Sequence, residues 1–408
     1  MAPGGLLLLV FAHGCGTPFL QSDAERNSDD ASDTHLDVRA SDSTSPPLGM
    51  DSGSPVHPVD GGAPPGDDGS TVPEDSGTVT PPPAHDAGSV TPPPEHDAGS
   101  VTPPPGHDAG SPPPVVDAGT PPPPTTGPTV GGCEIFPADN PWNRDISADP
   151  VDPRSASIIA NIQSNAGSSS EHYLHPDFGS NPSYGIPYVV VPASQASVPI
   201  TFNEYPSESD PGPYPVPSSA TIEGGNDHHV LVVQQGSCHL FEMYHSARSG
   251  SGWTAGSGAT WDLSSNALRP AGWTSCDQAG LPILPGLTRY DEVTAGAIHH
   301  ALRFTLNVPQ DTWVSPARHP GSSSDASAPP MGARLRLRAD FDLTPYHGES
   351  LVILRALKQY GMYVADTGPN WFVSGATDSR WDDTDLGQLR NVPGSAFEVV
   401  QLGTIEHY

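Results

Sequence analysis

The sequence predicts a mainly β domain, sandwich-like or jelly-roll-like with one or two helices, preceded by a disordered proline-rich linker. Three observations support this fold class. Short stretches alternate apolar and polar residues, loops rich in glycine and proline separate them, and all seven tryptophans of the 408-residue chain follow residue 132. Short alternating strands between such loops are typical of sandwiches and jelly rolls.

Residues 1–15 have the pattern of a lipoprotein signal peptide. Residues 6–12 form a short apolar run, and Cys15 follows the small residue Gly14. The pattern is similar to a bacterial lipobox, so we expect export, lipidation of Cys15 and anchoring at the outer membrane or cell surface. The alternative is a plain secretory signal with an incidental cysteine.

Residues 16–132 are expected to form a disordered acidic linker. The chain up to residue 132 has two basic residues against 18 acidic ones. Such a segment cannot bury enough apolar surface to offset its chain entropy. The unit HDAGSVTPPP starts at His85 and recurs with an eleven-residue period. Proline triplets stiffen a chain, so we expect the linker to hold a domain away from its anchor.

Residues 133–408 are expected to form one globular β-rich domain. They carry 14 basic and 29 acidic residues and are numerous enough for a large core. The acidic balance disfavours nucleic acid as a partner, because phosphate binding needs a basic surface. We expect a monomer, and no motif in the sequence predicts a cofactor.

Three cysteines remain besides Cys15, and in an exported protein two of them are expected to form a disulfide. The pair Cys133–Cys238 is favoured, because it would fix the start of the domain to a core strand. Cys238–Cys276 is the alternative, and the sequence does not decide between them.

Trp142 is expected in the core. The predicted helices and strands come after it in the sequence. Isoleucines at helical spacing predict a helix over residues 154–165, and leucines predict another over 351–360. Residues 249–287 have little periodicity and are expected to form a long loop. The expected strands cover residues 185–191, 198–205, 230–233, 240–244, 299–308, 333–341, 362–365 and 371–374.

Two of these strand pairs are expected to be hairpins. Residues 230–233 and 240–244 flank a short polar turn, and residues 362–365 and 371–374 flank the turn DTGPN. In residues 333–341, Arg334, Arg336 and Arg338 share one side. We expect that side to be the solvated face of an edge strand, because charges there block pairing with other sheets.

Several long motifs give the chain a family resemblance. They are FPADNPWNRDIS, ESDPGPYPVP, AGWTSCDQAGLPILPGLTRYDEV, HALRFT, PPMGARLRLRADFDL and ILRALKQYGMYVADTG. Together they resemble a group of exported bacterial proteins, over about residues 133–402. The resemblance implies no activity and assigns no catalytic residue.

Paired carboxylates are the favoured chemistry. Glycoside hydrolysis needs two carboxyl groups beside the sugar, one of them with a pKa raised by an apolar setting. Glu242 lies in a predicted core strand beside Tyr244, and Asp262 follows Trp261. We therefore expect Glu242 and Asp262 to be catalytic, assisted by His300, in a polysaccharide hydrolase.

The substrate site is expected beneath the tryptophan-bearing residues 249–287. Indole faces stack on sugar rings, and planar polar groups bind hydroxyls. The competing interpretation is that these tryptophans fill the core beneath long loops. The residues expected to bind substrate are His229, Tyr244, Trp261, Arg269, Trp273, Arg318 and His319.

Three other functions are weighed against this one. Five histidines, His228, His229, His299, His300 and His319, would suit zinc if they met, but no metal-binding motif is present. A lyase would use Tyr244 and His300 with an arginine such as Arg303, although the acidic charge disfavours an anionic substrate. The third alternative is a non-catalytic domain that binds glycan or a cell-surface partner.

Overall fold

The structure is a computed structural model that describes residues 127–408. The signal peptide and most of the linker therefore lie outside the described residues. Strand β1 (Thr129–Val130) pairs with β2 (Cys133–Glu134), so the folded part begins a few residues before Cys133. Among the described residues, no helix is both long and apolar enough to cross a membrane.

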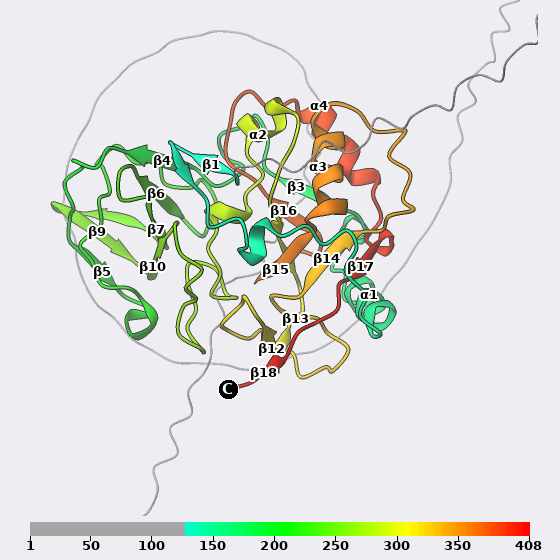
Figure 1. The fold of residues 1–408 in the computed structure, drawn as a ribbon. Coiled ribbons are helices and arrows are strands. Elements are labelled where there is room, and N and C mark those ends of the chain that lie inside the picture. The colour runs from blue at the N-terminus through cyan, green and yellow to red at the C-terminus, as the bar shows by residue number, and fades with distance from the viewer. Residues whose placement is uncertain (1–126) are drawn as a thin grey trace, which may run out of the picture. The chain divides into compact units, whose positions relative to one another are not determined.

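The predicted mainly β fold with few helices is confirmed. The described strands form two larger and three smaller sheets (Figure 1). The six-stranded sheet has the order β17 (Phe397–Val399), β14 (Arg334–Leu337), β15 (Met362–Thr367), β11 (Leu302–Leu306), β16 (Phe372–Ser374), β3 (His175–Asp177). The four-stranded sheet has the order β10 (Ser257–Asp262), β7 (His239–Tyr244), β6 (Val230–Gln234), β4 (Tyr188–Val191).

Two three-stranded sheets complete the β structure, in addition to the pair β1 and β2. One has the order β5 (Ile200–Phe202), β9 (Gly252–Ala255), β8 (Ala247–Ser249), and the other β13 (Pro330–Met331), β12 (Gln310–Val314), β18 (Ile405–Glu406). The α-helices are α1 (Ser155–Ser164), α2 (Tyr290–Ala295), α3 (Gly348–Gln359) and α4 (Asp383–Leu386). The 3-10 helices are η1 (Pro141–Asn143), η2 (Ser170–His172), η3 (Pro206–Glu208), η4 (Leu284–Gly286), η5 (Gly387–Asn391) and η6 (Gly394–Ala396).

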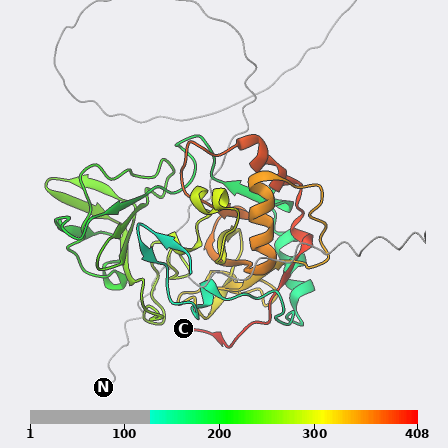
Figure 2. The ribbon, with the colours of Figure 1, turned by 45° about the horizontal axis from the view of Figure 1, so that its top comes forward.

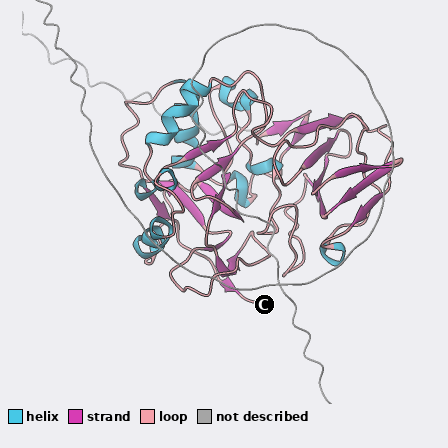
Figure 3. Cartoon of the chain, turned by 180° about the vertical axis from the view of Figure 1, so that it is seen from behind, coloured by secondary structure: helices cyan, strands magenta, loops and turns pink. Residues whose placement is uncertain are grey.

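The two larger sheets lie side by side in different surroundings. Helix α3 packs on β14 and α1 packs on β17, so helices gather around the six-stranded sheet (Figure 2). The four-stranded sheet is flanked by the small β5–β9–β8 sheet and by loops (Figure 3). Helices thus cover one larger sheet, and mostly strands and loops cover the other.

Strand β6 shows how the sequence builds these layers. Its run VLVV is apolar at every position, as expected for a strand buried on both faces. Leu231 and Val233 belong to the large core shared with the six-stranded sheet. Val230 and Val232 belong to a second core, with Trp253 of β9. The four-stranded sheet is therefore buried between two apolar layers.

Several local predictions are confirmed. The helices α1 and α3 lie where leucine and isoleucine spacing placed them, and β6 and β7 pair as the antiparallel hairpin. Trp142 is buried in the core. Cys133 and Cys238 form a disulfide, the favoured pairing, and Cys276 is a buried free cysteine.

Three local predictions are wrong. Strands β15 and β16 do not form a hairpin, because β11 lies between them and pairs with both. Arg334 and Arg336 are buried in a strand with neighbours on both sides, and their guanidinium groups bind backbone carbonyls of residues 141, 144, 146 and 360. The expected loop at 249–287 contains β9 and β10, whose small residues hid the alternation.

Candidate functional site

A buried segment, residues 275–284, lies between the two larger sheets, and we call it the junction segment. The four-stranded sheet and its leading loop hold it at three points. The His229 ring bonds through Nε2 to the Cys276 carbonyl at 2.9 Å, and Ser257 Oγ donates to the Ser275 carbonyl at 2.7 Å. The Glu242 carboxylate accepts the backbone N–H groups of Ile283 and Leu284 at 3.0 and 2.8 Å.

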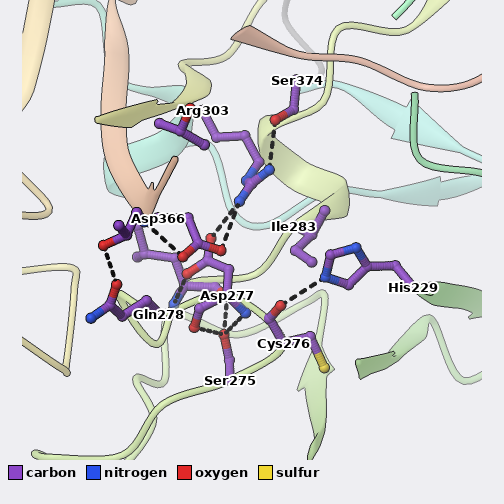
Figure 4. A network of polar contacts seen from close by, with 12 residues as sticks. His229, Ser275, Cys276, Asp277, Gln278, Ile283, Arg303, Asp366 and Ser374 are labelled. Carbon is purple, nitrogen blue, oxygen red and sulfur yellow. Dashed lines mark hydrogen bonds and ion pairs between the residues drawn. The ribbon is translucent and has the colours of Figure 1, made fainter. Parts of the chain in front are cut away.

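The other side of the junction segment faces an arginine of the six-stranded sheet (Figure 4). Arg303 of β11 lies 3.3 Å from the Asp277 carboxylate and 3.8 Å from that of Asp366. Its second terminal nitrogen donates to Ser374 Oγ at 2.6 Å. Asp277 is fully buried and Arg303 nearly so, while the Asp366 side chain keeps 14% of its surface exposed. The guanidinium of Arg303 therefore forms ion pairs with two carboxylates, Asp277 and Asp366.

The sheet register brings a third carboxylate to this place. Asp177 ends β3 and pairs with Ser374 of β16, the residue that Arg303 contacts. Asp366 lies near the end of β15, just after an irregularity in its pairing with β11. Such irregularities re-aim side chains at functional sites. Asp177 is exposed, so the set of carboxylates near Arg303 reaches solvent at Asp177.

The loop before β6 adds Glu223, Asp227 and His229. Nδ1 of His229 lies 2.6 Å from the Glu223 carboxylate, and both side chains are largely buried. His228 has a left-handed backbone (φ 49°), an uncommon conformation that clusters at functional sites. The Asp227 carbonyl accepts the N–H of His245 at 2.8 Å, which ties this loop to the end of β7.

We call Asp177, Glu223, Asp227, Asp277 and Asp366 the acidic cluster. Burial is the main cause that raises the pKa of Asp277 to about 6 and that of Asp366 well above its ordinary value. Although Asp177 is exposed to solvent, the protein atoms packed around it reduce the hydration of its carboxyl. This desolvation, followed by the charge of Glu223, raises the pKa of Asp177 to about 6. Arg303 and His229 are the cations that contact the cluster, so its negative charge is only partly neutralised.

Glu223 behaves in the opposite way. Burial disfavours its charge, but the neighbouring His229 outweighs burial and lowers the pKa of Glu223. The same contact raises the pKa of His229 to about 9 against its own burial. Between about pH 4.5 and pH 6, Glu223 is therefore ionised while Asp177 can keep its proton. Two neighbouring carboxyls with pKa values moved apart are the arrangement that acid–base catalysis uses.

The structure does not bring the three predicted catalytic residues together. Glu242 is fully buried, and burial raises its pKa to about 7. Asp262 is exposed and accepts from Ser264. His300 is fully buried against Glu292 and the Ala301 carbonyl. No hydrogen bond or ion pair joins these three described residues, so none of them is assigned a catalytic role here.

The predicted substrate-binding residues divide between two places. His229 contacts Glu223 of the acidic cluster, and the ring of the buried Tyr244 lies 5.8 Å from the His229 ring. Arg269 lies over both Trp261 and Trp273 and binds Asp210, while Arg318 donates to the Arg269 carbonyl. His319 packs edge-on against Tyr408. These tryptophans and arginines mainly fill the structure instead of forming an open platform.

A shallow surface pocket lies beside Trp261; it encloses about 20 Å³, and about 350 Å³ when the open solvent at its mouth is included. Leu268 at its rim is 48% exposed, while Trp142 and Trp261 are buried in its wall. Gly280, Leu281 and Pro282 of the junction segment also line it. The junction segment therefore lines this pocket with one part and supplies Asp277 to the acidic cluster with another.

None of the five carboxylates of the acidic cluster was predicted from the sequence as a site residue. A signal for them was present at the strand ends. Asp366 directly follows the predicted strand 362–365, and Glu223 and Asp227 shortly precede the strand at 230. Asp277 stands in the apolar stretch CDQAGLPILPG, where a carboxylate needs a partner. Polar residues at strand ends therefore indicated the position of the candidate site better than carboxylates within strands did.

Comparison with known proteins adds no assignment. No family model, curated protein or solved structure matches the chain. Among the described residues, no three histidine, cysteine, aspartate or glutamate side chains are placed to hold a metal ion.

Proposed function

We propose that the described domain is an acid–base hydrolase of neutral polysaccharide that works at the acidic cluster. One arrangement carries the proposal: the exposed Asp177 at the end of β3 lies within electrostatic reach of Glu223, which His229 contacts at 2.6 Å. These surroundings shift the pKa values of the two carboxyls in opposite directions. Asp177 is the general acid, because it is exposed and holds its proton to about pH 6. Glu223 is the ionised base or nucleophile.

Charge supports a neutral substrate. The acidic cluster outnumbers the cations that contact it, and the part of the chain after residue 132 is acidic as a whole. An anionic sugar would be repelled from such a surface. A lyase would also need a cation free to hold a uronate, whereas Arg303 is engaged by Asp277, Asp366 and Ser374. Hydrolysis of neutral glycan is therefore favoured over uronate elimination.

The test is a hydrolysis screen of the full chain on glucans, xylans, mannans and galactans, measured as new reducing ends. The variants Asp177→Asn and Glu223→Gln should each lower kcat by roughly 100-fold to 10,000-fold, the usual contribution of a general acid or base. Asp262→Asn is the matched control, since this exposed carboxylate lies outside the cluster. Wild-type turnover that survives both substitutions would contradict the proposal.

The pH profile provides a second test. Because protonated Asp177 is required, kcat/KM should fall about tenfold per pH unit above about pH 6. On the acid side activity should persist below pH 4.5, because the pKa of Glu223 is lowered from that ordinary value. A flat profile between pH 5 and 8 would remove Asp177 from the acid role.

We also propose that the enzyme is exported and anchored through a lipid on Cys15. The apolar residues 6–12 ahead of Cys15 and the acidic proline-rich linker support this. Feeding expressing bacteria an alkyne-tagged fatty acid should label the wild type and leave Cys15→Ser unlabelled. Equal labelling of both would remove Cys15 as the lipid site.

The pocket beside Trp261 favours a second candidate, a non-catalytic glycan-binding domain. Its wall contains Trp142 and Trp261, and the exposed Leu268 stands at its rim. The pocket is too small to enclose a sugar, so a glycan would lie across the rim. In that case glycan retention should be lost in Leu268→Asp, which places a charge at the rim, and kept in Asp177→Asn. The hydrolase predicts the reverse pattern for turnover.

A further inference from the structure

A loop between β3 and β4, residues 181–185, lies against Gly224, the residue after Glu223. A side-chain carbon added to Gly224 would stand 3.1 Å from the Ser183 Cα atom and 3.4 Å from its carbonyl oxygen. The two backbones are therefore in close contact, and a side chain at position 224 would require Ser183 to move slightly. Since Glu223 directly precedes Gly224, the loop borders the proposed base or nucleophile.

The same loop also borders the end of β16. Thr377 Oγ1 donates to the Tyr184 carbonyl at 3.1 Å, and Ile186 forms a bridge with Ala376. These residues follow Ser374, which pairs with Asp177. Tyr184 thus stands on a loop that contacts Gly224 on one side and the chain following Ser374 on the other.

The backbone of the loop is held in place. Asn181 accepts the N–H of Tyr184 through its carbonyl at 3.0 Å and that of Ser183 through its side chain at 2.9 Å. Gly185 has φ 84°, and a side-chain carbon there would lie 2.9 Å from the Gly375 carbonyl oxygen. Only glycine fits both requirements. The loop therefore presents Tyr184 from a fixed turn, with 44% of that residue exposed.

We propose that Tyr184 is a binding residue for the neutral polysaccharide, stacking on a sugar ring next to the one held at Asp177 and Glu223. This inference rests on the proposed function. A phenol ring offers a flat apolar face to the C–H face of a sugar, and its hydroxyl tolerates water. An exposed tyrosine alone needs no explanation. The role is assigned by the contacts of its loop with Gly224, the neighbour of Glu223, and with the chain that follows Ser374, the partner of Asp177.

Tyr173 supplies a matched control. It is 42% exposed, nearly the same as Tyr184. It lies just before β3, whereas Asp177 ends that strand, and its backbone forms a bridge with Pro393. A general effect of losing an exposed tyrosine would therefore appear in both variants.

The experiment measures binding without turnover. The full chain carrying Asp177→Asn is titrated calorimetrically with hexasaccharides of neutral glucan, xylan and mannan. Adding Tyr184→Ala should raise Kd at least about tenfold, which corresponds to about 1.4 kcal/mol. Tyr184→Phe should stay within about twofold, Tyr184→Leu should behave like alanine, and Tyr173→Ala should have no effect.

The outcomes separate the two proposals. If Tyr184→Ala and Tyr184→Leu bind like their parent while the wild type hydrolyses glycan, the stacking role is overturned and the hydrolase stands. Equal losses in the Tyr184 and Tyr173 variants would also overturn the stacking role. If no hexasaccharide binds and the wild type hydrolyses none of the polysaccharides, both proposals fail.

Discussion

The acidic cluster and the tryptophan-bearing region around Trp261, Arg269 and Trp273 differ in how far their charges are matched. In the tryptophan-bearing region Arg269 binds Asp210 and backbone carbonyls and covers two indoles. In the cluster, Arg303 and His229 face five carboxylates. The comparison teaches that the unneutralised region, not the one richest in aromatic residues, is the better candidate for chemistry.

The largest expected effect comes from removing the shared cation. Arg303→Ala leaves Asp277 and Asp366 buried without their partner, so the free energy of unfolding at pH 7 should fall by about 3 to 5 kcal/mol. Urea unfolding measures it. Much of the loss should disappear at pH 5, where the carboxyls take up protons. The half-exposed Arg338→Ala is the control and should change little.

The next largest loss of stability is expected in the tryptophan-bearing region. Trp261 is 7% exposed and packs in the main core, so Trp261→Ala should cost about 3 kcal/mol. Unlike Arg303→Ala, this loss should be the same at pH 5 and pH 7, because no titrating group loses its partner. A loss that depended on pH would break the distinction between the two regions.

The pH dependence of the wild type is expected to be smaller. Burial raises the pKa of Glu242 to about 7 and that of Asp277 to about 6, so folding favours their protonated forms. This stabilisation is complete below the unfolded values near 4 and is lost as pH rises to about 7. The free energy of unfolding should therefore fall by about 2 kcal/mol between pH 5 and 7.5. A rise across that range would contradict these pKa directions.

The smallest effect is expected at the hydrogen bonds between Glu242 and the junction segment. Glu242→Gln exchanges a carboxylate oxygen for an amide N–H that meets the N–H groups of Ile283 and Leu284, at a cost of about 1 to 2 kcal/mol. Hydrogen exchange should speed up at these two amides. Asp262→Asn, on the adjacent strand β10, should leave both amides unchanged. Unchanged exchange in Glu242→Gln would show that Glu242 does not hold the junction segment.

Local elements of this fold could be predicted from the sequence, but long-range pairing could not. The alternation in residues 302–306 and the spacing in α1 and α3 are local signals. Nothing local records that β11 inserts between β15 and β16, because the pairing partner is set by tertiary packing. The arginines of β14 were misjudged for the same reason, since their backbone acceptors come from distant segments.

The site was less predictable than the fold. His229 and Arg303 were named from sequence, but Asp177, Glu223 and Asp277 come from three segments that only the folded chain unites. Glu242 was singled out correctly as an unusual buried acid, yet its partners are backbone amides that no side-chain pattern reveals. A buried carboxylate in a strand signals a partner without telling which one.

The Cys133–Cys238 disulfide has a mechanical consequence. A pull on the chain ahead of Cys133, resisted beyond Cys238, travels across the sulfur bridge and bypasses the residues between, a separation of 105 positions. Asp177 and Glu223 both belong to that bypassed loop. Tension along the chain would therefore leave the spacing of these two carboxylates undisturbed while the bridge stays oxidised.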